Sequence, residues 1–439
     1  MHALPRGALA LSILDGQSLL PGTKGLPITE PLRQGAIGVQ GWNVLRADTS
    51  FPVAVLKASA LQHNLAWMKA FCKRHGVTLA PHGKTTMSPQ LFAAQLANGA
   101  WGITLASATQ VQVAHRFNVR RVLLANQLVA RADIEAVLAL LHDDPDFECI
   151  VLADSLDGVA RLSGAVSARG LARPLPVLVE LGLAGKRAGC RTSEQALTVA
   201  RAIAAADGLA LAGFEGYEGL LVTDDRDADV RAVNAFLAEL VELVKRADGE
   251  NLFGGADILL SAGGSSYFDL VARGFTGVDG LSRPVRAVLR SGCYLTSDHG
   301  SYQRLLAQLD AREVHGEGLR PALEVWSMVQ SRPEPGLAIL TMGKRDASYD
   351  IDLPVPLFTH RPGSDAVQAV ALPPGCTIAK MNDQHAYLSL PEGDIRDQLL
   401  VGDLVGCGIS HPCTTFDKWQ VLLAVDDAYN VTQALNTFF

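Results

Sequence analysis

Apolar and polar positions follow one rhythm between about residues 51 and 290 and a different rhythm beyond residue 290. In the first stretch, short apolar runs alternate with longer segments in which apolar residues recur every three to four positions. Such an alternation of strands and helices forms parallel β-α-β units. The strand-like runs cover residues 52–56, 77–80, 101–106, 121–125, 149–153, 176–181, 209–214 and 258–261.

The number of these units predicts the fold class. Segments with a helical apolar pattern lie between the runs, among them residues 61–72, 133–141, 194–205 and 230–245. Seven or eight repeats over about 240 residues are typical of an α/β protein with a (β/α)8 barrel of the TIM type. An open, doubly wound sheet is the alternative, because the period of a sequence does not tell whether its sheet closes.

After about residue 290 the chain changes to short runs in which apolar and polar residues alternate. These runs cover residues 323–328, 337–341, 376–381, 385–390, 404–409 and 420–425. That pattern, with proline and glycine clusters between the runs, predicts an antiparallel β domain. We therefore expect an irregular N-terminal extension over residues 1–47, a barrel over residues 48–290 and a C-terminal β domain over residues 291–439. The extension covers either part of the active site or an interface.

Composition narrows the class of protein. Of the 439 residues, 48% are hydrophobic and 19% are charged, as in a globular protein with large cores. The net charge of −7 is spread thinly and without a basic run, which argues against nucleic acid as a partner. No apolar stretch reaches the ~18 residues of a membrane span. Residues 8–14 resemble the core of a signal peptide only faintly, because the segment is short, Asp15 follows at once and no cleavage site of small residues is evident. The seven cysteines form no closely spaced pair, so we expect reduced thiols and a cytoplasmic protein.

A lysine lies where barrel enzymes place their chemistry. The run 77–80 predicts a strand, and Ser88 and Pro89 predict the N-cap and first residue of the next helix. Lys84 lies between them, on the turn after the carboxyl end of the strand. A partly desolvated lysine loses its proton more easily and acts as a Schiff-base nucleophile. An ordinary solvated surface lysine is the alternative interpretation.

Glycine-rich turns follow three later strands. Residues 261–266, Ser-Ala-Gly-Gly-Ser-Ser, come after a strand late in the repeat, where barrels often bind phosphate. Backbone N–H groups and serine hydroxyls of such a turn bind a phosphate group well. Residues 179–189 and 214–219 bring charged, aromatic and glycine residues to the same rim. Each segment taken alone is equally consistent with an ordinary turn.

A histidine and a cysteine near the C-terminus form a candidate metal pair. On an extended segment, His411 and Cys413 point to the same face because they are two residues apart. An imidazole and a thiolate together suit a borderline or soft metal, zinc first. Two protein ligands leave positions for water or substrate, as in a catalytic site. A buried cysteine beside a hydrogen-bonded histidine is the alternative.

In this order along the chain, the motifs resemble one known family. Residues 81–85, 179–189, 216–219, 263–266 and 411–415 are similar to the motifs of pyridoxal-phosphate enzymes with an alanine-racemase-like barrel. The resemblance is to the branch of D-threonine aldolase and the metal-dependent, eukaryotic-type D-serine dehydratase, and it extends from about residue 50 to the C-terminus. It implies that the run 52–56 joins the β domain and that residues 285–293 supply the eighth barrel strand.

The resemblance also implies roles for individual residues. Lys84 matches the lysine that binds pyridoxal 5′-phosphate covalently, and His82 matches the histidine beside it. Further matches are Gly263, Gly264 and Ser265 as the phosphate loop, Arg187 near the cofactor's 3′-oxygen, Tyr217 beside its ring, Arg290 near its pyridine nitrogen, and His411 and Cys413 as ligands of a divalent metal, zinc or manganese. Relatives often carry an acidic residue two positions after Glu180, where this chain has Gly182.

A cofactor that stabilises charge at Cα and a metal that stabilises a leaving hydroxyl together imply a reaction. Lys84 is positioned to take the Cα proton. We expect a dehydratase that acts on D-serine or a related β-hydroxy D-amino acid and yields a 2-oxo acid and ammonia. The D preference, and a homodimer, come from the resemblance. The alternatives are a D-threonine-type aldolase, whose relatives more often have a carboxylate at the position of Cys413, and a non-catalytic pyridoxal-phosphate carrier.

Overall fold

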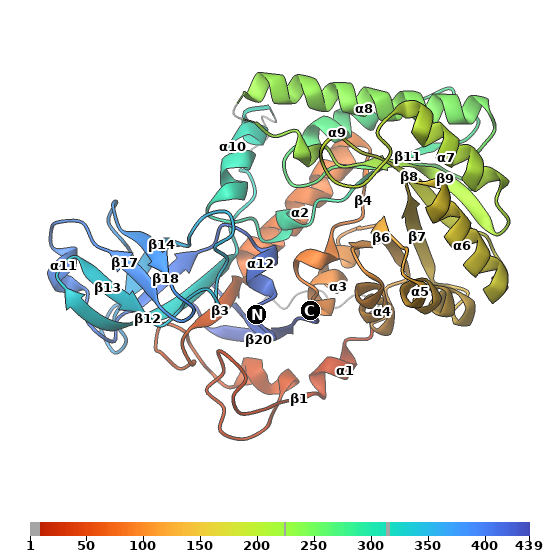
Figure 1. The fold of residues 1–439 in the computed structure, drawn as a ribbon. Helices are drawn as coiled ribbons and strands as arrows, with labels where there is room; N and C mark the ends of the chain where they lie inside the picture. Colours follow the sequence, from red (N-terminus) through yellow and green to blue (C-terminus); the bar gives the residue numbers. More distant parts are fainter. Residues whose placement is uncertain (1–8, 224, 313–316) are drawn as a thin grey trace. The chain divides into compact units, whose positions relative to one another are not determined.

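The computed structural model describes residues 9–223, 225–312 and 317–439, which form two compact units (Figure 1). We call the first the barrel unit; it consists of Met68–Lys84 and Gln95–Gly292. We call the second the β unit; it consists of Met1–Trp67, Thr85–Ala94 and Cys293–Phe439. The boundaries expected from sequence near residues 47 and 290 stay a prediction.

Eight parallel strands form the centre of the barrel unit. In order of pairing they are β4 (Thr78–Leu79), β11 (Val285–Leu289), β10 (Ile258–Ala262), β9 (Leu209–Gly216), β8 (Leu175–Leu181), β7 (Glu148–Ala153), β6 (Arg121–Gln127) and β5 (Ile103–Leu105). A parallel bridge between His82 and Thr104 joins the two ends of this order, so the sheet closes. The predicted (β/α)8 barrel is confirmed.

Apolar side chains that point into the barrel hold its strands together. One buried cluster, the barrel core, joins Ala80, Leu123, Ile150, Leu152, Leu178, Ala212, Leu259 and Val288. Strands of a closed parallel sheet are buried on both faces, since helices cover the outer face. That burial explains why the strands read as nearly continuous apolar runs in the sequence.

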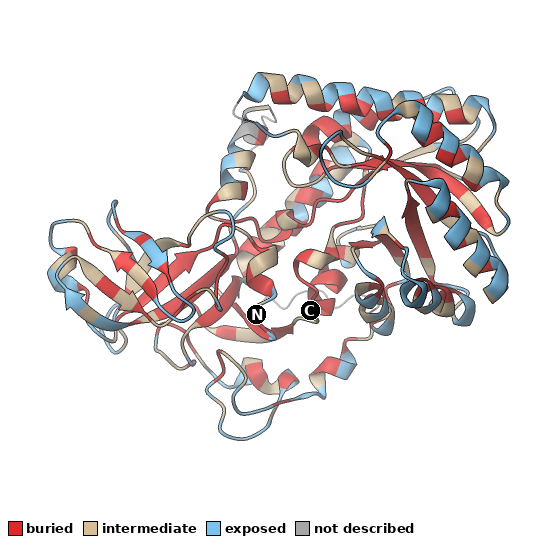
Figure 2. Ribbon diagram, viewed as in Figure 1, coloured by how far each residue is buried: buried red, intermediate tan, exposed pale blue. Residues whose placement is uncertain are grey.

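Helices cover the outside of the barrel and show exposed outer faces in Figure 2. They include α4 (Ala108–Arg116), α5 (Arg131–Asp143), α6 (Leu156–Arg169), α7 (Ser193–Ala205), α8 (Arg226–Gly249) and α9 (Phe268–Phe275). Ser107 is the N-cap of α4, because its side chain accepts a hydrogen bond from the Gln110 N–H. Helix α3 (Pro89–Ala97) begins directly after Ser88, as the sequence indicates.

Antiparallel strands form the main sheet of the β unit, as predicted. Its longest strand, β12 (Leu323–Glu334), pairs with β18 (Leu404–Gly408), β13 (Leu337–Leu340) and β3 (Val53–Lys57). The other strands are β14 (Val355–His360), β15 (Val370–Ala371), β16 (Thr377–Met381), β17 (Ala386–Ser389), β19 (Val421–Val425) and β20 (Val431–Asn436). The sequence does not predict strand β14, because its residues do not alternate between buried and exposed positions.

Two strands lie where the resemblance places them, and not where periodicity alone does. Strand β3 covers most of the run 52–56 and belongs to the sheet of the β unit, where it pairs with β12 and β19. Strand β11 supplies the eighth strand of the barrel and pairs with β10 and β4. Periodicity cannot separate these cases, since both strands are short and apolar.

The described part of the N-terminal extension packs on the β unit. It contains α1 (Ser12–Asp15), β1 (Ser18–Leu19), β2 (Leu32–Arg33) and a 3-10 helix over Gln34–Val39. Leu19, Leu26 and Ile37 are buried in the same cluster as Trp326 and Val431. In the described parts of the chain, no helix has both the length and the apolar character that crossing a membrane requires.

Candidate active site

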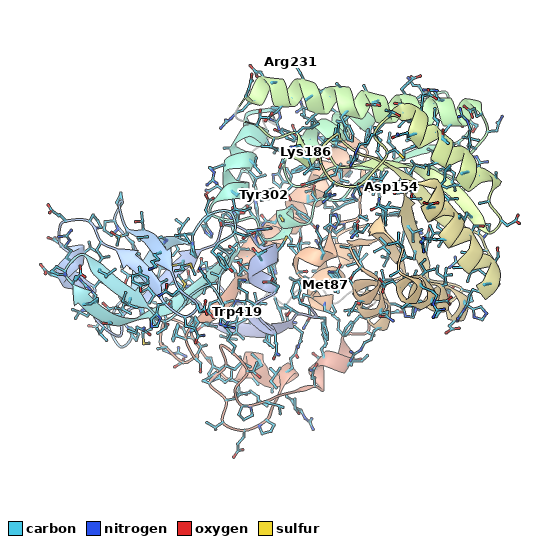
Figure 3. The ribbon with its side chains drawn as sticks, in the orientation of Figure 1. Met87, Asp154, Lys186, Arg231, Tyr302 and Trp419 are labelled. Carbon is cyan, nitrogen blue, oxygen red and sulfur yellow. The ribbon has the colours of Figure 1, made fainter. Side chains whose placement is uncertain are left out.

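Polar side chains form a layer at the carboxyl ends of the barrel strands, one step beyond the barrel core. Side chains two residues apart on a strand point to the same side. The residues two positions after inward-pointing apolar residues are His82, Gln127, Asp154, Glu180, Ser261 and Arg290, which follow Ala80, Ala125, Leu152, Leu178, Leu259 and Val288. The strand ends of a barrel are where such enzymes hold their reacting groups. Figure 3 labels Asp154 at the end of β7.

Arg290 is a buried cation held on three sides within this layer. Its Nη1 lies 2.5 Å from Oε2 of Glu215 and donates to Oγ of Ser261 at 2.9 Å. Its Nη2 donates to the carbonyl oxygen of Gly216 at 2.9 Å. Its Nε is buried and has no hydrogen-bond partner among the described residues. One donor of Arg290 therefore stays available to a group that enters the barrel mouth.

Two acidic side chains accompany this arginine. Burial raises the pKa of Glu215 to about 7, although the charge of Arg290 acts in the opposite direction. Glu180, on the neighbouring strand, accepts a hydrogen bond from the side-chain amide of Gln127. Both carboxylates are buried, so their charges act strongly on anything bound beside them.

His82 and Lys84, the two predicted catalytic residues, follow β4. Burial, and then the charges of Lys84, Arg290 and Arg187, lower the pKa of His82 well below its usual value. The imidazole is therefore neutral, and its buried Nδ1 has no partner in the described part of the chain. Lys84 lies on a 3-10 turn over Gly83–Thr85 and is half-buried. No hydrogen bond or ion pair to another described residue occupies its amine.

Arg187, Tyr217 and Gly264, all predicted site residues, are brought together. The guanidinium of Arg187 lies 4.7 Å from the centre of the Tyr217 ring, a cation–π contact. The same ring packs against Gly264 so closely that a Cβ there would come within 2.4 Å of it. A side chain at position 264 would therefore require the ring of Tyr217 to move. The loop over residues 184–188 carries Arg187 and the exposed Lys186, which Figure 3 labels.

The predicted phosphate loop already binds a carboxylate. The N–H of Gly263 donates to Glu218 at 3.0 Å, and the N–H of Gly264 donates to the other oxygen of Glu218 at 2.9 Å. Gly263 has a φ of +91°, which favours glycine and turns these N–H groups to one side. The loop thus binds an anionic group of the chain itself, and its role as a phosphate loop stays a prediction. A phosphate would use the remaining donors of Ser265 and Ser266 or replace Glu218.

These residues fit a phosphorylated pyridine aldehyde. A free lysine amine at a strand end suits a covalent bond to an aldehyde. The orphaned Nε of Arg290 and Nδ1 of His82 offer buried polar atoms to a polar ring. The loop at Gly263 and Gly264 has the backbone geometry that anions require. The residues of the barrel mouth therefore fit pyridoxal 5′-phosphate. The carboxylate of Glu218 occupies the N–H donors of Gly263 and Gly264 in this structure.

His411 and Cys413, the predicted metal pair, lie in the β unit and are close together. The expectation of an extended segment is wrong: Pro412 is helical (φ −58°, ψ −44°) and Cys413 opens the short helix α12 (Cys413–Phe416). A hydrogen bond with Cys413 is the main cause that raises the pKa of His411 to about 9. The pKa of Cys413 lies well below its usual value, first because of Cys293 and also because of His411.

The surroundings of the pair fit a metal. Nδ1 of His411 lies 2.6 Å from Oδ2 of Asp350, and Oδ1 of Asp350 accepts from Thr414 at 2.7 Å. A carboxylate on Nδ1 fixes the tautomer that leaves Nε2 for a metal. Cys293 Sγ lies 3.9 Å from Cys413 Sγ. Among the described residues, no group of three or more His, Cys, Asp or Glu side chains is arranged around a metal position.

Sequence reasoning missed several residues of both centres. Gln127 and Asp154 belong to no motif, but each is a polar residue at the end of an apolar strand and lies an even number of residues from a core residue of that strand. That parity is a signal that could have found them. Glu215 lies in the segment 214–219, three residues after the core residue Ala212, and an irregularity in the pairing of β9 with β8 changes the parity between them. Asp350 and Cys293 come from segments far from His411 in sequence, and only the folded chain brings them near it.

Two family models match the chain and correspond to its two kinds of domain. The alanine racemase N-terminal domain matches residues 56–272. The domain described as "Putative serine dehydratase domain" matches residues 322–425. The first match covers most of the barrel and the second covers the sheet that carries His411 and Cys413. The fold and the site thus define an alanine-racemase-like barrel protein joined to a dehydratase-type domain.

Curated relatives and solved structures agree with this class. The chain is 26% identical over 353 residues to 3-hydroxy-D-aspartate aldolase of Paracoccus denitrificans (strain Pd 1222), covering 80% of this chain and 83% of the relative. It is 26% identical over 391 residues to D-threonine aldolase of Arthrobacter sp, covering 87% and 90%. It is 24% identical over 391 residues to D-threo-3-hydroxyaspartate dehydratase of Delftia sp. (strain HT23), covering 87% and 96%.

The fold is shared with solved structures of the same group. D-threonine aldolase from Filomicrobium marinum matches with a TM-score of 0.73 at 24% identity, over 90% of this chain and 97% of that chain. The resemblance read from the motifs is confirmed. The chain carries a domain of the alanine racemase N-terminal type and a domain of the serine dehydratase type, and it is similar over most of its length to D-threonine aldolase and D-threo-3-hydroxyaspartate dehydratase.

Proposed function

We propose that this protein is a pyridoxal-phosphate- and metal-dependent dehydratase that acts on D-serine or a related β-hydroxy D-amino acid. The broad class, a pyridoxal-phosphate-dependent lyase of D-amino acids, is supported by the named relatives, which are aldolases and a dehydratase of such substrates. The particular reaction and the metal are our proposal. The products would be a 2-oxo acid and ammonia.

The barrel mouth supplies the groups that hold the cofactor and move a proton. Lys84 would bind the cofactor covalently, and Arg290 Nε and the loop at Gly263–Ser265 would hold its ring and phosphate. When bound, pyridoxal 5′-phosphate delocalises the negative charge that forms at Cα of the amino acid. The Lys84 amine, once freed, takes the Cα proton. His82 stays neutral beside it, because burial disfavours the imidazolium.

His411 and Cys413 would hold a divalent metal, with zinc favoured by the thiolate. A metal with two protein ligands keeps open positions for the substrate. Bound there, it would act as a Lewis acid on the β-hydroxyl and would stabilise the negative charge as that group leaves. Thr85, whose Oγ1 lies 3.4 Å from Cys413 Sγ, directly follows Lys84 in the chain.

The cysteine at position 413 is the observation that carries the dehydratase assignment over the aldolase. Solved structures of D-threo-3-hydroxyaspartate dehydratase include a histidine-to-alanine mutant and a cysteine-to-alanine mutant, the latter in the metal-free form. The two mutated positions of that dehydratase are two residues apart. His411 and Cys413 have the same spacing and order. An aldolase of D-threonine-type substrates, using the same groups, is the second candidate, because two of the named relatives are aldolases.

A product assay separates these candidates. The purified protein, reconstituted with pyridoxal phosphate and zinc or manganese, is given D-serine, D-threonine and the D-3-hydroxyaspartates, with the L enantiomers as controls. A dehydratase releases ammonia and a 2-oxo acid in equal amounts, whereas an aldolase releases glycine and an aldehyde. Glycine and aldehyde as the main products would replace the proposal by the aldolase. No turnover by the fully reconstituted protein would favour a cofactor carrier. Sedimentation of the same sample tests the proposed homodimer.

A further inference from the structure

Three neighbouring barrel strands place Glu215, Ser261 and Arg290 in one layer. Ser261 of β10 pairs with Glu215 of β9 on one side and with Val288 of β11 on the other. Arg290 lies two residues beyond Val288 and so points to the same side of the sheet. The charged pair Glu215–Arg290 therefore spans the width of β10 inside the barrel mouth. Its side chains are 2% and 4% exposed, which makes it a buried ion pair.

The contacts of Arg290 leave its Nε–H without a hydrogen-bond acceptor among the described residues. A guanidinium has five N–H donors in a rigid plane. Glu215 and Ser261 engage Nη1, and the Gly216 carbonyl engages Nη2. These contacts hold the guanidinium plane of Arg290 through Nη1 and Nη2. They therefore fix the direction in which the free Nε–H points. Glu215 is the one of these groups that carries a charge.

We propose that Glu215 is a positioning residue that holds Arg290 and sets the charge that Arg290 presents to the ring of the bound cofactor. This inference rests on the proposed function, because it concerns the cofactor's ring. With Glu215 ionised, the pair is nearly neutral and the cofactor faces a dipole. With Glu215 protonated or replaced by an amide, the cofactor faces the full charge of an arginine in a buried site.

The other charges around Glu215 favour such a role. Glu180 on β8 faces it and opposes its ionisation, whereas Arg290 and Arg187 favour it. Burial outweighs the arginines and brings the pKa of Glu215 to about 7. His82, whose pKa is lowered by burial and by the charges of Lys84, Arg290 and Arg187, stays neutral. Glu215 is therefore a group of this layer whose charge changes near neutral pH.

A structural role alone predicts something different. Removing one partner of a buried ion pair destabilises a fold wherever the pair lies. A merely structural Glu215 would thus lower stability and cofactor occupancy without changing the spectrum of the molecules that bind cofactor. The experiment must therefore measure the absorption spectrum of the bound cofactor, and not only stability or occupancy.

The experiment compares the visible absorption of bound pyridoxal phosphate from pH 5.5 to 9 in wild type, Glu215→Gln, Glu215→Asp and Asp229→Asn. Asp229 is the matched control: it is a buried carboxylate of the barrel unit that is bonded to Thr223 and Tyr267 and lies outside the candidate site. Loss of one negative charge near the cofactor disfavours its protonated form by about tenfold. We expect the apparent pKa of the visible band to fall by about one in Glu215→Gln, by less in Glu215→Asp, and not in Asp229→Asn.

Borohydride trapping at Lys84 in each sample separates this inference from the proposed function. A Glu215→Gln band with the wild-type pKa, or an equal fall in Asp229→Asn, would overturn the inference while trapping at Lys84 still supports the function. If Glu215→Gln does not fold, an unchanged band pKa in Glu215→Asp overturns it, because its carboxylate is one methylene further from Arg290. Absence of trapping in wild type would overturn both.

Discussion

Replacing Asp350 by asparagine should weaken metal binding at His411 without removing either proposed ligand. Oδ2 of Asp350 lies 2.6 Å from Nδ1 of His411 and fixes the ring so that Nε2 is free. Outer-shell carboxylates of this kind contribute roughly 10- to 100-fold to metal affinity. The Asp350 side chain is 41% exposed, and solvent screens its charge, so we expect the lower end, about tenfold or ~1.4 kcal/mol.

The measurement is a competition titration of zinc against a chromophoric chelator, together with turnover at increasing metal concentration. Asp352→Asn is the matched control, since Asp352 pairs with Arg304 instead of His411. We expect a tenfold weaker metal affinity in Asp350→Asn, full turnover at saturating metal, and wild-type behaviour in Asp352→Asn. Wild-type affinity in Asp350→Asn, or a loss of turnover that saturating zinc does not restore, would refute the role of Asp350 in orienting a metal ligand.

Two further predictions concern the barrel unit. The folded pKa of His82 is well below 6.5 because of burial and nearby cations, so below pH 6.5 only the unfolded state gains its proton and stability falls. Between pH 6.5 and 5 this costs up to about 2 kcal/mol, and urea unfolding of His82→Gln should show a correspondingly weaker pH dependence; identical pH profiles would contradict the assignment. Glu218→Gln loses a charged acceptor of the Gly263 and Gly264 N–H groups and should lower the unfolding free energy by about 1–3 kcal/mol. The exposed Glu242→Gln should be neutral in the same urea experiment, and equal values for the two variants would show that Glu218 does not brace the loop.

Much of the fold is predictable because it follows from local patterns. The capping signal at Ser107 and the proline at residue 89 mark real helix starts, and buried parallel strands read as apolar runs. The placement of β3 is different, because its five residues form as good a strand in either sheet. Pairing with β12, some 270 residues away, determines that β3 belongs to the sheet of the β unit. No local sequence pattern contains that information.

The residues of the candidate site also fall into those that local sequence patterns predict and those that depend on long-range contacts. Lys84 could be located from the strand before it and the helix after it, since chain order alone puts it on the rim. His411 and Cys413 are close together, but the helical turn at Pro412, and not the extended segment that the spacing predicts, brings them together. Asp350 could not be predicted, since its contact with His411 depends on tertiary packing. The engagement of the glycine loop by Glu218 could not be predicted either, because a carboxylate at that position reads as an ordinary turn residue.

The most direct test of the account is to find the lysine that binds the cofactor. The protein is incubated with pyridoxal phosphate, reduced with borohydride and digested with trypsin. Reduction at Lys84 blocks cleavage there and yields one modified peptide that spans residues 75–116. We expect this peptide in wild type and in the exposed-lysine control Lys186→Ala, and its absence in Lys84→Ala. Modification of a different lysine, or an unmodified and fully cleaved Lys84, would contradict the central claim that the turn after β4 carries the cofactor.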